Sequence, residues 1–346
     1  MEGRVLSIQS HVAFGYVGGK AAAFPLQCLN YDVDVVNTVN FSNHAGYGRS
    51  GGSKTSAAEL ESIFDAMEFN ELLDPARLLT GYTPNAEALT AVAKLARKLR
   101  ERKPELVYLL DPVMGDAGRL YVAPDVIPVY RTMLPLSTII TPNWFEVETL
   151  TDITLTDMPS LRRALAKLHK DFGVPNVAIS SIPLKPWLSE TLPLSIRPPF
   201  ASESGYLLCI SSSASPEDTP KVHAQCVPLL AGYFSGVGDL FSSLVLAHYN
   251  PSDTSRTESR TPFSQAVSQA LTKTHAVLCE TFRHSEQLPE EERFATDDEK
   301  DEVEPLRKVR RMRGRELRLV QSIDIIRGQF NDATRHLETW TGFWDN

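Results

Sequence analysis

Short apolar stretches alternate with amphipathic ones along the first half of the chain. Residues 4–9 and 32–39 are rich in β-branched side chains and predict strands, and residues 21–29 between them predict a helix. Valine is so frequent in residues 32–39 that we expect this strand to be buried on both faces. A strand, a helix and a second strand in this order are typical of a parallel sheet with right-handed crossovers.

The same rhythm continues to about residue 180. The predicted helices cover residues 57–68, 85–102 and 161–172, and the predicted strands cover residues 78–83, 106–110, 137–141 and 176–180. We therefore predict an α/β fold with a mostly parallel, doubly wound central sheet. The loops that follow the strands should gather at one edge of that sheet, where α/β proteins bind ligands.

The pattern is less regular in the second half of the chain. Residues 206–211 and 221–227 predict two strands of an antiparallel pair, and a polar segment with prolines links them. Residues 240–249 and 263–283 are apolar and amphipathic stretches that predict helices. The second half should therefore extend the sheet and add two long helices to it.

Two segments interrupt this pattern. Residues 183–204 contain five prolines and predict a flexible surface insertion. Residues 284–315 separate acidic from basic side chains, and we expect a second, disordered insertion for which a regulatory or partner-binding role stays open. Alternation returns in residues 316–322, which predict a strand that rejoins the sheet.

Composition narrows the class of protein. The 346 residues are 42% hydrophobic, and we expect a single domain over residues 1–346. A net charge of −8 argues against nucleic acid or an anionic membrane as the main partner. We find no signal-peptide core and no apolar run that could span a bilayer, so we expect a cytoplasmic protein, with nuclear presence left open. The four cysteines are far apart and should be isolated thiols.

The main candidate for chemistry is Gly-Val-Gly-Asp at residues 236–239, directly before an apolar helix. Gly236 and Gly238 allow backbone N–H groups to approach an anion, and the start of a helix adds partial positive charge. Asp239 at that position could take a proton from an attacking hydroxyl group. The alternative is that Asp239 only caps the helix and the glycines only form the turn.

Polar side chains also follow two of the predicted strands. Asp111 and Asp116 come after residues 106–110, and Asn143 and Glu146 come after residues 137–141. Oxygen ligands at the carboxyl edge of a sheet suit a magnesium ion or its water shell. The alternatives are a turn formed by Asp111 with the proline after it, and a helix cap formed by Asn143.

Together these stretches resemble pyridoxal kinase, a family of the ribokinase-like superfamily. The resemblance covers most of residues 3–182 and residues 230–282. It implies a three-layer α/β/α fold around a mostly parallel central sheet. The motifs that carry it are Leu-Ser-Ile-Gln-Ser-His at 6–11 with Gly-Tyr-Val-Gly at 15–18, Asn-Phe-Ser-Asn-His at 40–44, Leu-Thr-Gly-Tyr-Thr at 79–83, Asp-Pro-Val at 111–113, Thr-Pro-Asn at 141–143, Gly-Asp-Leu-Phe at 238–241 and Glu-Leu-Arg at 316–318.

The resemblance implies a reaction and a set of residues for it. The reaction is ATP-dependent phosphorylation of the 5′-hydroxymethyl group of pyridoxal, pyridoxine or pyridoxamine, which gives pyridoxal 5′-phosphate and related products in vitamin B6 salvage. Asp239 would be the general base, with Gly236 and Gly238 presenting N–H groups to the phosphate. The residues expected around the vitamer, besides Asp239, are Ser10, Val17, Val39, His44 and Tyr82.

The resemblance also implies the nucleotide, the metals and the assembly. Mg²⁺ would accompany ATP, and a monovalent cation such as K⁺ would lie near Asp116 and Thr141. The family pairs as homodimers, which we expect here as well. The residues expected to contact the nucleotide are Asp111, Tyr121, Asn143, Ser181 and Val237, and those expected near metal are Asp116, Thr141 and Glu146.

One departure from the family pattern keeps two other functions open. Val237 stands where relatives usually carry threonine, so a hydroxyl group beside the phosphates is missing. One alternative is a vitamer-binding protein that has weak turnover or none, which only Val237 favours. The other is a hydroxymethylpyrimidine kinase of the same superfamily, which Asp239 and the loop at residues 42–44 oppose.

Overall fold

The computed structural model describes residues 3–116, 118–198, 205–214, 219–253, 260–328 and 335–345. One large sheet dominates these residues, and a two-stranded ribbon, β6 (Gly115–Asp116) with β7 (Arg119–Leu120), stands apart from it. The strands of the large sheet are β1 (Arg4–Val12), β2 (Asp32–Phe41), β3 (Gly52–Lys54), β4 (Arg77–Thr80), β5 (Val107–Leu110), β8 (Ile139–Ile140), β9 (Asn176–Pro183), β10 (Tyr206–Ser213), β11 (Lys221–Pro228) and β12 (Glu338–Thr339).

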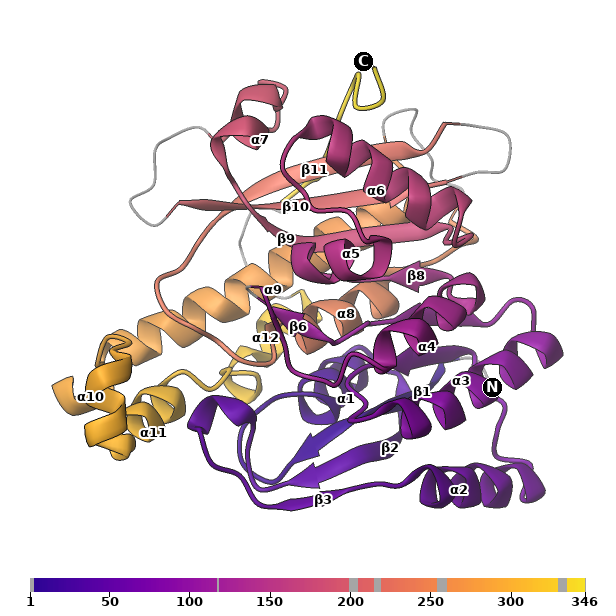
Figure 1. Ribbon diagram of the computed structural model, residues 1–346, viewed down its shortest axis with the longest axis horizontal. Coiled ribbons are helices and arrows are strands. Elements are labelled where there is room, and N and C mark those ends of the chain that lie inside the picture. The colour runs from indigo at the N-terminus through magenta and orange to yellow at the C-terminus, as the bar shows by residue number, and fades with distance from the viewer. Residues whose placement is uncertain are drawn as a thin grey trace.

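The strands are mostly parallel, as predicted. Their order in space is β12-β11-β10-β9-β8-β5-β4-β1-β2-β3 (Figure 1). All neighbours from β2 to β9 are parallel, whereas β3, β10, β11 and β12 pair in the antiparallel sense. The carboxyl ends of β1, β2, β4, β5, β8 and β9 therefore meet at one edge of the sheet, and the predicted antiparallel pair is confirmed.

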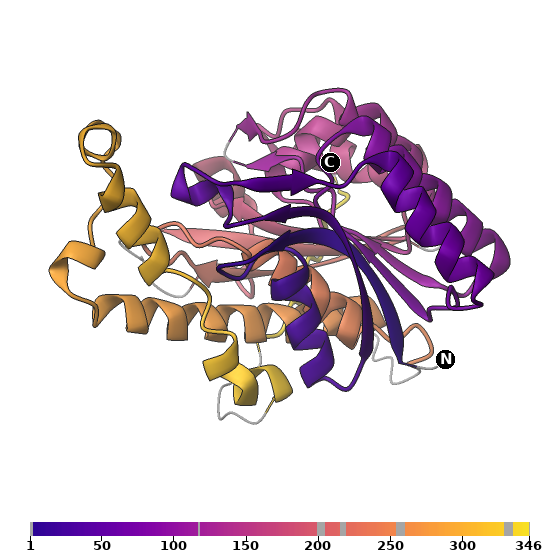
Figure 2. The same cartoon turned by 90° about the horizontal axis from the view of Figure 1, so that it is seen from below.

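Helices cover both faces of the sheet, which gives the three layers seen in Figure 2. One face packs against α2 (Ala57–Phe69), α3 (Ala86–Arg102), α4 (Val126–Met133), α5 (Trp144–Thr151), α6 (Met158–Lys170) and α7 (Pro186–Thr191). The other face packs against α1 (Gly19–Cys28), α8 (Val237–His248), α9 (Pro262–Glu286) and α12 (Ile323–Arg327). Short 3₁₀ turns lie at Ala45–Tyr47, Leu134–Leu136, Glu290–Glu292 and Val320–Ser322.

Two expectations about the chain as a whole can be compared with this structure. Within the described ranges, no helix is both long and apolar enough to cross a bilayer. All four cysteines lie in the described ranges and none forms a disulfide, and Cys28, Cys209 and Cys226 are buried in the core. The prediction of isolated thiols is therefore confirmed.

The prediction of disorder for residues 284–315 is wrong. This segment continues α9 and then forms α10 (Asp298–Val303) and α11 (Pro305–Gly314). Its separated charges pair with each other across the turns: Asp301 binds Arg311 in a buried ion pair, and Arg313 binds Glu292 at 2.6 Å. Opposite charges that lie far apart in the sequence can still be neighbours in space, so their separation did not indicate disorder.

The strand predicted for residues 316–322 is also wrong. No sheet pairing forms there, and a 3₁₀ turn at Val320–Ser322 leads into α12. The alternation has another cause, because Leu317 and Leu319 are buried against the core. The N–H group of Arg318 between them donates to Thr281 Oγ1 on α9 at 3.0 Å, so a side chain replaces the partner strand.

The insertion predicted at residues 183–204 is anchored over its described part. β9 extends to Pro183 and α7 follows it, and residues 199–204 lie outside the described residues. Leu188, Leu192 and Ile196 are buried in the core that covers one face of the sheet. Apolar contacts therefore hold the segment that its prolines suggested to be flexible.

One arginine links the sheet to the end of α8. Arg77 at the start of β4 donates to the carbonyl oxygens of Leu246 at 2.7 Å and Tyr249 at 2.9 Å. Because a buried carbonyl without a donor is costly, we expect Arg77→Met to lower the free energy of unfolding by about 2–4 kcal/mol. Urea unfolding followed by circular dichroism would measure this, with Arg97→Met, on the exposed side of α3, as the control. Equal midpoints for the two variants would contradict this role of Arg77.

Candidate active site

A glycine turn leads into α8 beside the carboxyl ends of the parallel strands. Gly236 has a φ of +81°, and a Cβ atom there would lie only 2.0 Å from the carbonyl oxygen of Tyr16. Gly238 in the first turn is exposed and faces open space. The first N–H groups of a helix have no partner within the helix, so this opening offers hydrogen-bond donors to an anion.

Asp239 lies in the first turn of α8 and faces the loop after β1. Its Oδ2 atom accepts a hydrogen bond from the N–H group of Gly18 at 2.7 Å. Burial raises the pKa of Asp239, and the Gly18 hydrogen bond offsets only part of that rise. A carboxylate with increased proton affinity beside an anion-binding turn is suited to act as a general base.

Asp111, directly after β5, belongs to a buried hydrogen-bonded chain with Ser242 and Thr141. Ser242 Oγ, one turn further along α8 than Asp239, donates to Asp111 Oδ2 at 2.8 Å and lies 2.8 Å from Thr141 Oγ1. Burial raises the pKa of Asp111, and the negative charge of Asp239 raises it further. The structure thus brings together Asp239, Asp111 and Thr141, which come from three separate segments.

Asn143 and Glu146 form the capping box that begins α5. Asn143 Oδ1 accepts from the Glu146 N–H group at 3.0 Å, and Glu146 Oε2 accepts from the Asn143 N–H group at 2.9 Å. Glu146 Oε1 also accepts from Met114 N at 2.9 Å, and Asn143 Nδ2 donates to the carbonyl oxygen of Gly115 at 2.8 Å. Both side chains therefore fix the loop that carries Asp116, while the carboxylate of Glu146 stays almost fully buried.

The carboxylates of Asp111, Asp239 and Glu146 form an acidic cluster without a basic partner. Burial and the charge of Asp111 raise the pKa of Glu146 well above its ordinary value. No lysine or arginine of the described ranges pairs with these three groups, and no three acidic, histidine or cysteine side chains there converge on a point that could hold a metal alone. A hard cation would fit this oxygen-rich cluster if phosphate or water supplied its remaining ligands.

The residues expected around the vitamer lie in β1, β2 and the loops after β1, β2 and β4. Ser10 and Val39 are direct neighbours in β1 and β2, at a register shift between these strands. Val17 precedes the Gly18 N–H group that binds Asp239, and Tyr82 follows β4, with its carbonyl oxygen accepting from Thr38 Oγ1 at 2.6 Å. His44 begins the 3₁₀ turn after β2, where its Nδ1 atom accepts from the N–H group of Gly46 at 3.1 Å.

Three other expected site residues come from β9 and from the ribbon region after β5. Tyr121 is 53% exposed, and burial of its remaining surface together with Tyr233 raises its pKa. Ser181 is partly buried in β9 next to an irregularity in its pairing with β10, and Asp116 lies in the ribbon strand β6. The charges of Asp116 and Glu146 also raise the pKa of Tyr121, so this tyrosine lies close enough to the acidic residues to interact with them.

The sequence interpretation missed two side chains at this site. Ser242 stands three positions after Asp239, and side chains with this spacing share one face of a helix, so the sequence contained a signal for it. Glu316 lies 3.0 Å from His44 through its Oε1 atom, although the two residues are far apart in the chain. Apart from its place in a family motif, nothing in the sequence indicated that Glu316 reaches the site.

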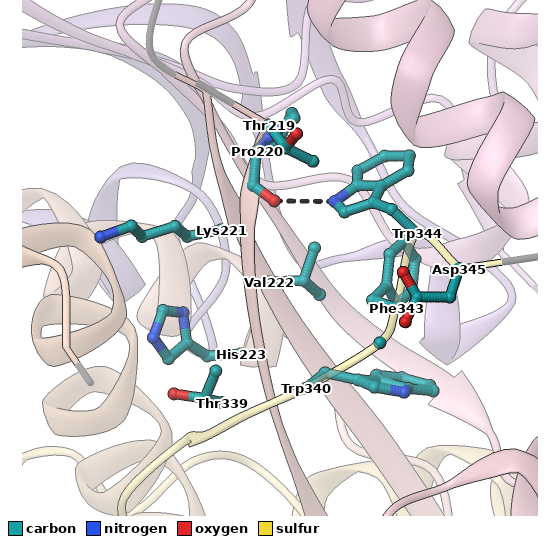
Figure 3. Close-up of a pocket in the computed structure, with 11 residues that line it drawn as sticks. Thr219, Pro220, Lys221, Val222, His223, Thr339, Trp340, Phe343, Trp344 and Asp345 are labelled. Atoms are coloured by element: carbon teal, nitrogen blue, oxygen red, sulfur yellow. Dashed lines mark hydrogen bonds between the residues drawn. The ribbon is translucent and has the colours of Figure 1, made fainter. Parts of the chain in front are cut away.

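A hollow of about 280 Å³ lies elsewhere, at the opposite edge of the sheet. It is lined by the start of β11 and by the C-terminal segment. Lys221 at the start of β11 pairs with Ser213, and Ser213 pairs with Asn176 at the start of β9, so the hollow lies at the amino ends of the parallel strands. Figure 3 shows Trp340, Phe343 and Trp344 along one side, with Trp344 Nε1 donating to the carbonyl oxygen of Pro220 at 2.7 Å. These aromatic rings attach the C-terminal segment to the sheet, remote from Asp239.

Known proteins are similar to this chain in sequence and in fold. Residues 48–186 match the family described as phosphomethylpyrimidine kinase. The chain is 39% identical to pyridoxal kinase of Arabidopsis thaliana over 250 residues, which cover 72% of this chain and 74% of the relative. It is 36% identical to human pyridoxal kinase over 263 residues, which cover 73% and 80%.

Solved structures extend the similarity over nearly the whole chain. Pyridoxal kinase from Leishmania donovani in complex with ADP and pyridoxine aligns with 98% of this chain and 99% of its own, at 30% identity and a TM-score of 0.77. The ribokinase-like arrangement of a mostly parallel sheet between helices is therefore confirmed. The chain is 39% and 36% identical to the pyridoxal kinases of Arabidopsis thaliana and human, over more than two thirds of their length, and it therefore belongs to the pyridoxal kinase family.

Proposed function

We propose that this protein transfers the γ-phosphoryl group of ATP to the 5′-hydroxymethyl group of a B6 vitamer. The observation that carries the proposal is Asp239, a carboxylate of raised pKa placed at an anion-binding turn and supported by Asp111. The relative from Leishmania donovani was solved with ADP and pyridoxine, and it shares this fold. A kinase of pyridoxal, pyridoxine and pyridoxamine is the function that this geometry and this family support best.

In this reaction Asp239 takes a proton from the vitamer, and the glycine turn beside it holds the phosphoryl group. The hydroxyl proton of the vitamer passes to the Asp239 carboxylate while the hydroxyl oxygen forms a bond to the γ-phosphorus. The bond from that phosphorus to the bridging oxygen breaks, and ADP leaves with the electron pair. The N–H groups around Gly236 and Gly238 would stabilise the transferring phosphoryl group by fixed hydrogen bonds.

The other site residues keep the roles that the resemblance implies. Around the vitamer we propose Ser10, Val17, Val39, His44 and Tyr82. Along the nucleotide we propose Asp111, Tyr121, Asn143, Ser181 and Val237. The place of Asp111 in the acidic cluster, and of Asn143 in the capping box with Glu146, support the phosphate end of this assignment, and the exposed surface of Tyr121 suits the adenosine end.

A kinase that uses ATP requires a divalent cation to neutralise phosphate charge. We propose Mg²⁺, because the unpaired oxygen-rich cluster of Asp111 and Glu146 matches the ligands that this ion prefers. We propose K⁺ as a monovalent cation near Asp116 and Thr141. When bound, the divalent ion would offset the repulsion between carboxylates and phosphates.

The assembly and the compartment are further proposals. We propose one kinase domain over residues 1–346 that forms a homodimer, as the family resemblance implies. We propose the cytoplasm as its compartment, because proteins of reducing compartments rarely carry disulfides and none of the four cysteines, all in the described part of the chain, forms one. Sedimentation equilibrium of the purified protein would test the dimer.

The decisive experiment measures ADP release from the purified protein with ATP, Mg²⁺ and K⁺. Pyridoxal, pyridoxine, pyridoxamine and hydroxymethylpyrimidine are offered in parallel, with and without EDTA. Turnover that depends on a vitamer and stops with EDTA would support the proposal, and the ranking of vitamers would give the preferred substrate. Turnover on the pyrimidine alone would move the protein to the pyrimidine branch, which the match over residues 48–186 keeps as the second candidate.

Val237 provides a separate prediction about rate. It occupies the first position of α8, where its backbone can still donate but its side chain cannot. A hydrogen bond to a charged group contributes about 1.5–3 kcal/mol, so Val237→Thr should raise kcat/KM for ATP by roughly tenfold or more. Val237→Ala is the matched control, because it changes the shape without adding a hydroxyl group. If threonine and alanine behave alike, the missing hydroxyl does not limit this enzyme.

A further inference from the structure

Glu316 is a buried carboxylate that joins two loops of the vitamer site. Its Oε1 atom lies 2.7 Å from the hydroxyl group of Tyr47 and 3.0 Å from His44 Nε2, and its Oε2 atom accepts from the N–H group of Tyr16 at 2.9 Å. The side chain is only 12% exposed. Although burial alone would raise the pKa of Glu316, these hydrogen bonds outweigh it and hold the pKa below its ordinary value, so the group stays ionised.

The contact with Glu316 fixes the protonation of the His44 ring. Nδ1 of His44 accepts from the N–H group of Gly46, so that nitrogen carries no proton in this arrangement. Nε2 therefore carries the proton and donates it to Glu316 Oε1. Ser235 Oγ, from the turn before α8, lies 3.3 Å from Nδ1. With both nitrogens engaged, His44 can offer a bound vitamer only the face and the carbon edge of its ring.

The hydrogen bond from Tyr16 connects Glu316 with the loop that contacts the proposed base, Asp239. A Cβ atom on Gly15 would lie 2.5 Å from Glu316 Oε1, so only glycine allows the carboxylate to approach this loop. The carbonyl oxygen of Tyr16 packs against Gly236, and the Gly18 N–H group binds Asp239. Glu316 therefore holds one end of a short loop whose other end contacts the general base.

Glu316 directly follows residues 284–315, the segment that the sequence suggested to be disordered. It follows α11, which lies beside the 3₁₀ turn Ala45–Tyr47 (Figure 1). Met312 on α11 would touch a Cβ atom on Gly46 at 2.9 Å, and Arg315 packs against Gly232 ahead of the glycine turn. The buried pair of Asp301 and Arg311 holds α10 against α11 and so keeps this segment in place.

We propose that Glu316 is a positioning residue for the vitamer, through which the segment of α10 and α11 sets the conformation of the two vitamer loops. The proposal rests on the proposed kinase function and extends it to a side chain outside the expected site. Glu316 acts directly on His44 and on the loop of residues 15–18, and on Asp239 only through that loop. Its removal should therefore change affinity for the vitamer much more than affinity for ATP.

Glu316→Gln is the variant that tests this role. The amide keeps one acceptor for Tyr47 and His44, but its NH₂ group would face the Tyr16 N–H group, donor against donor. Loss of a charge-assisted hydrogen bond predicts a rise in KM for pyridoxal of about 10–100-fold, with KM for ATP and kcat changed less than about threefold. Glu302→Gln, an exposed carboxylate of α10, is the matched control and should behave as the wild type.

A spectroscopic readout separates this role from general destabilisation and from the kinase assay. In ¹⁵N-histidine spectra, the His44 resonances should show the Nε2–H form in the wild type, and Glu316→Gln should shift them or broaden them by solvent exchange. His44→Gln identifies those resonances. This comparison needs no turnover, so it still tests the contact if the wild type phosphorylates none of the four acceptors, an outcome that would overturn only the proposed function.

A milder variant keeps the test valid if Glu316→Gln folds poorly. Tyr47→Phe removes one hydroxyl group and its 2.7 Å hydrogen bond to Glu316. It should raise KM for pyridoxal about threefold, and the double variant should show less than the product of the two effects, because both act through one carboxylate. Unchanged KM for pyridoxal in both variants, or equal losses for pyridoxal and ATP, would overturn the proposal.

Discussion

Asp239→Asn should lower kcat for vitamer phosphorylation by about 10²–10⁴-fold, the usual contribution of a general base. The amide is nearly the same size as the carboxylate and can still accept from the Gly18 N–H group, which now binds Oδ2 at 2.7 Å. Only the ability to take the hydroxyl proton is lost. The measurement is ADP release at saturating ATP and pyridoxal, with vitamer affinity followed separately by calorimetry.

Asp324→Asn is the matched control for this variant. Asp324 also lies in the first turn of a helix, α12, but it is exposed and remote from the turn at Gly236. It should keep wild-type kcat. If Asp239→Asn retained more than a tenth of the wild-type rate, Asp239 would be a helix cap and the glycine turn would need another base.

Asp111→Asn should raise the stability of the protein near pH 7.5 and lower its kinase activity. The pKa of Asp111 is raised by burial and by the charge of Asp239, so the folded protein binds a proton that the unfolded chain has already released. Without a cation, the free energy of unfolding therefore falls as pH rises from about 4, the ordinary carboxyl pKa, towards the raised value. Asparagine cannot ionise, so the variant should lose this slope and be more stable than the wild type near pH 7.5 by about 1–3 kcal/mol.

The same substitution should lower kcat by about 10²–10³-fold, because a charge opposite the phosphates and their cation is lost. Urea midpoints in EDTA at pH 5 and pH 7.5, together with ADP release in Mg²⁺, measure both effects. Asp125→Asn, an exposed position before α4, should leave both unchanged. A variant less stable than the wild type at pH 7.5 would show that the buried carboxylate is compensated by a group other than a bound cation.

Local patterns were sufficient for most of the fold. The β-branched run in residues 32–39 and the strand rhythm up to residue 180 predicted the parallel sheet, because side-chain periodicity is set by neighbours a few positions apart. The burial of residues 32–39 on both faces is a wrong prediction, because Val35 in β2 is 44% exposed. The helix cap that the sequence offered as one reading of Asn143 is present, since both halves of its capping box lie within one turn. Gly236 and Asp239 were found for the same reason.

Local patterns failed where the partner was distant. Alternation in residues 316–322 indicated a strand, but Leu317 and Leu319 face a helical layer, and the pattern alone does not say what lies on the buried side. The separated acidic and basic side chains of residues 284–315 indicated a disordered segment. Asp301 and Arg311 neutralise each other only because α10 and α11 turn back on one another.

The sequence by itself therefore determined the class of fold, the alternation of strands and helices up to about residue 180, the glycine turn with Asp239 and the family resemblance. Only the tertiary structure brought Ser242 to Asp111, placed the charge of Asp239 where it raises the pKa of Asp111, and carried Glu316 to His44. The physical reason is range: periodicity, caps and turns act over a few residues. Burial, charge coupling and contacts between remote segments depend on how the crossovers stack the strands at one edge of the sheet.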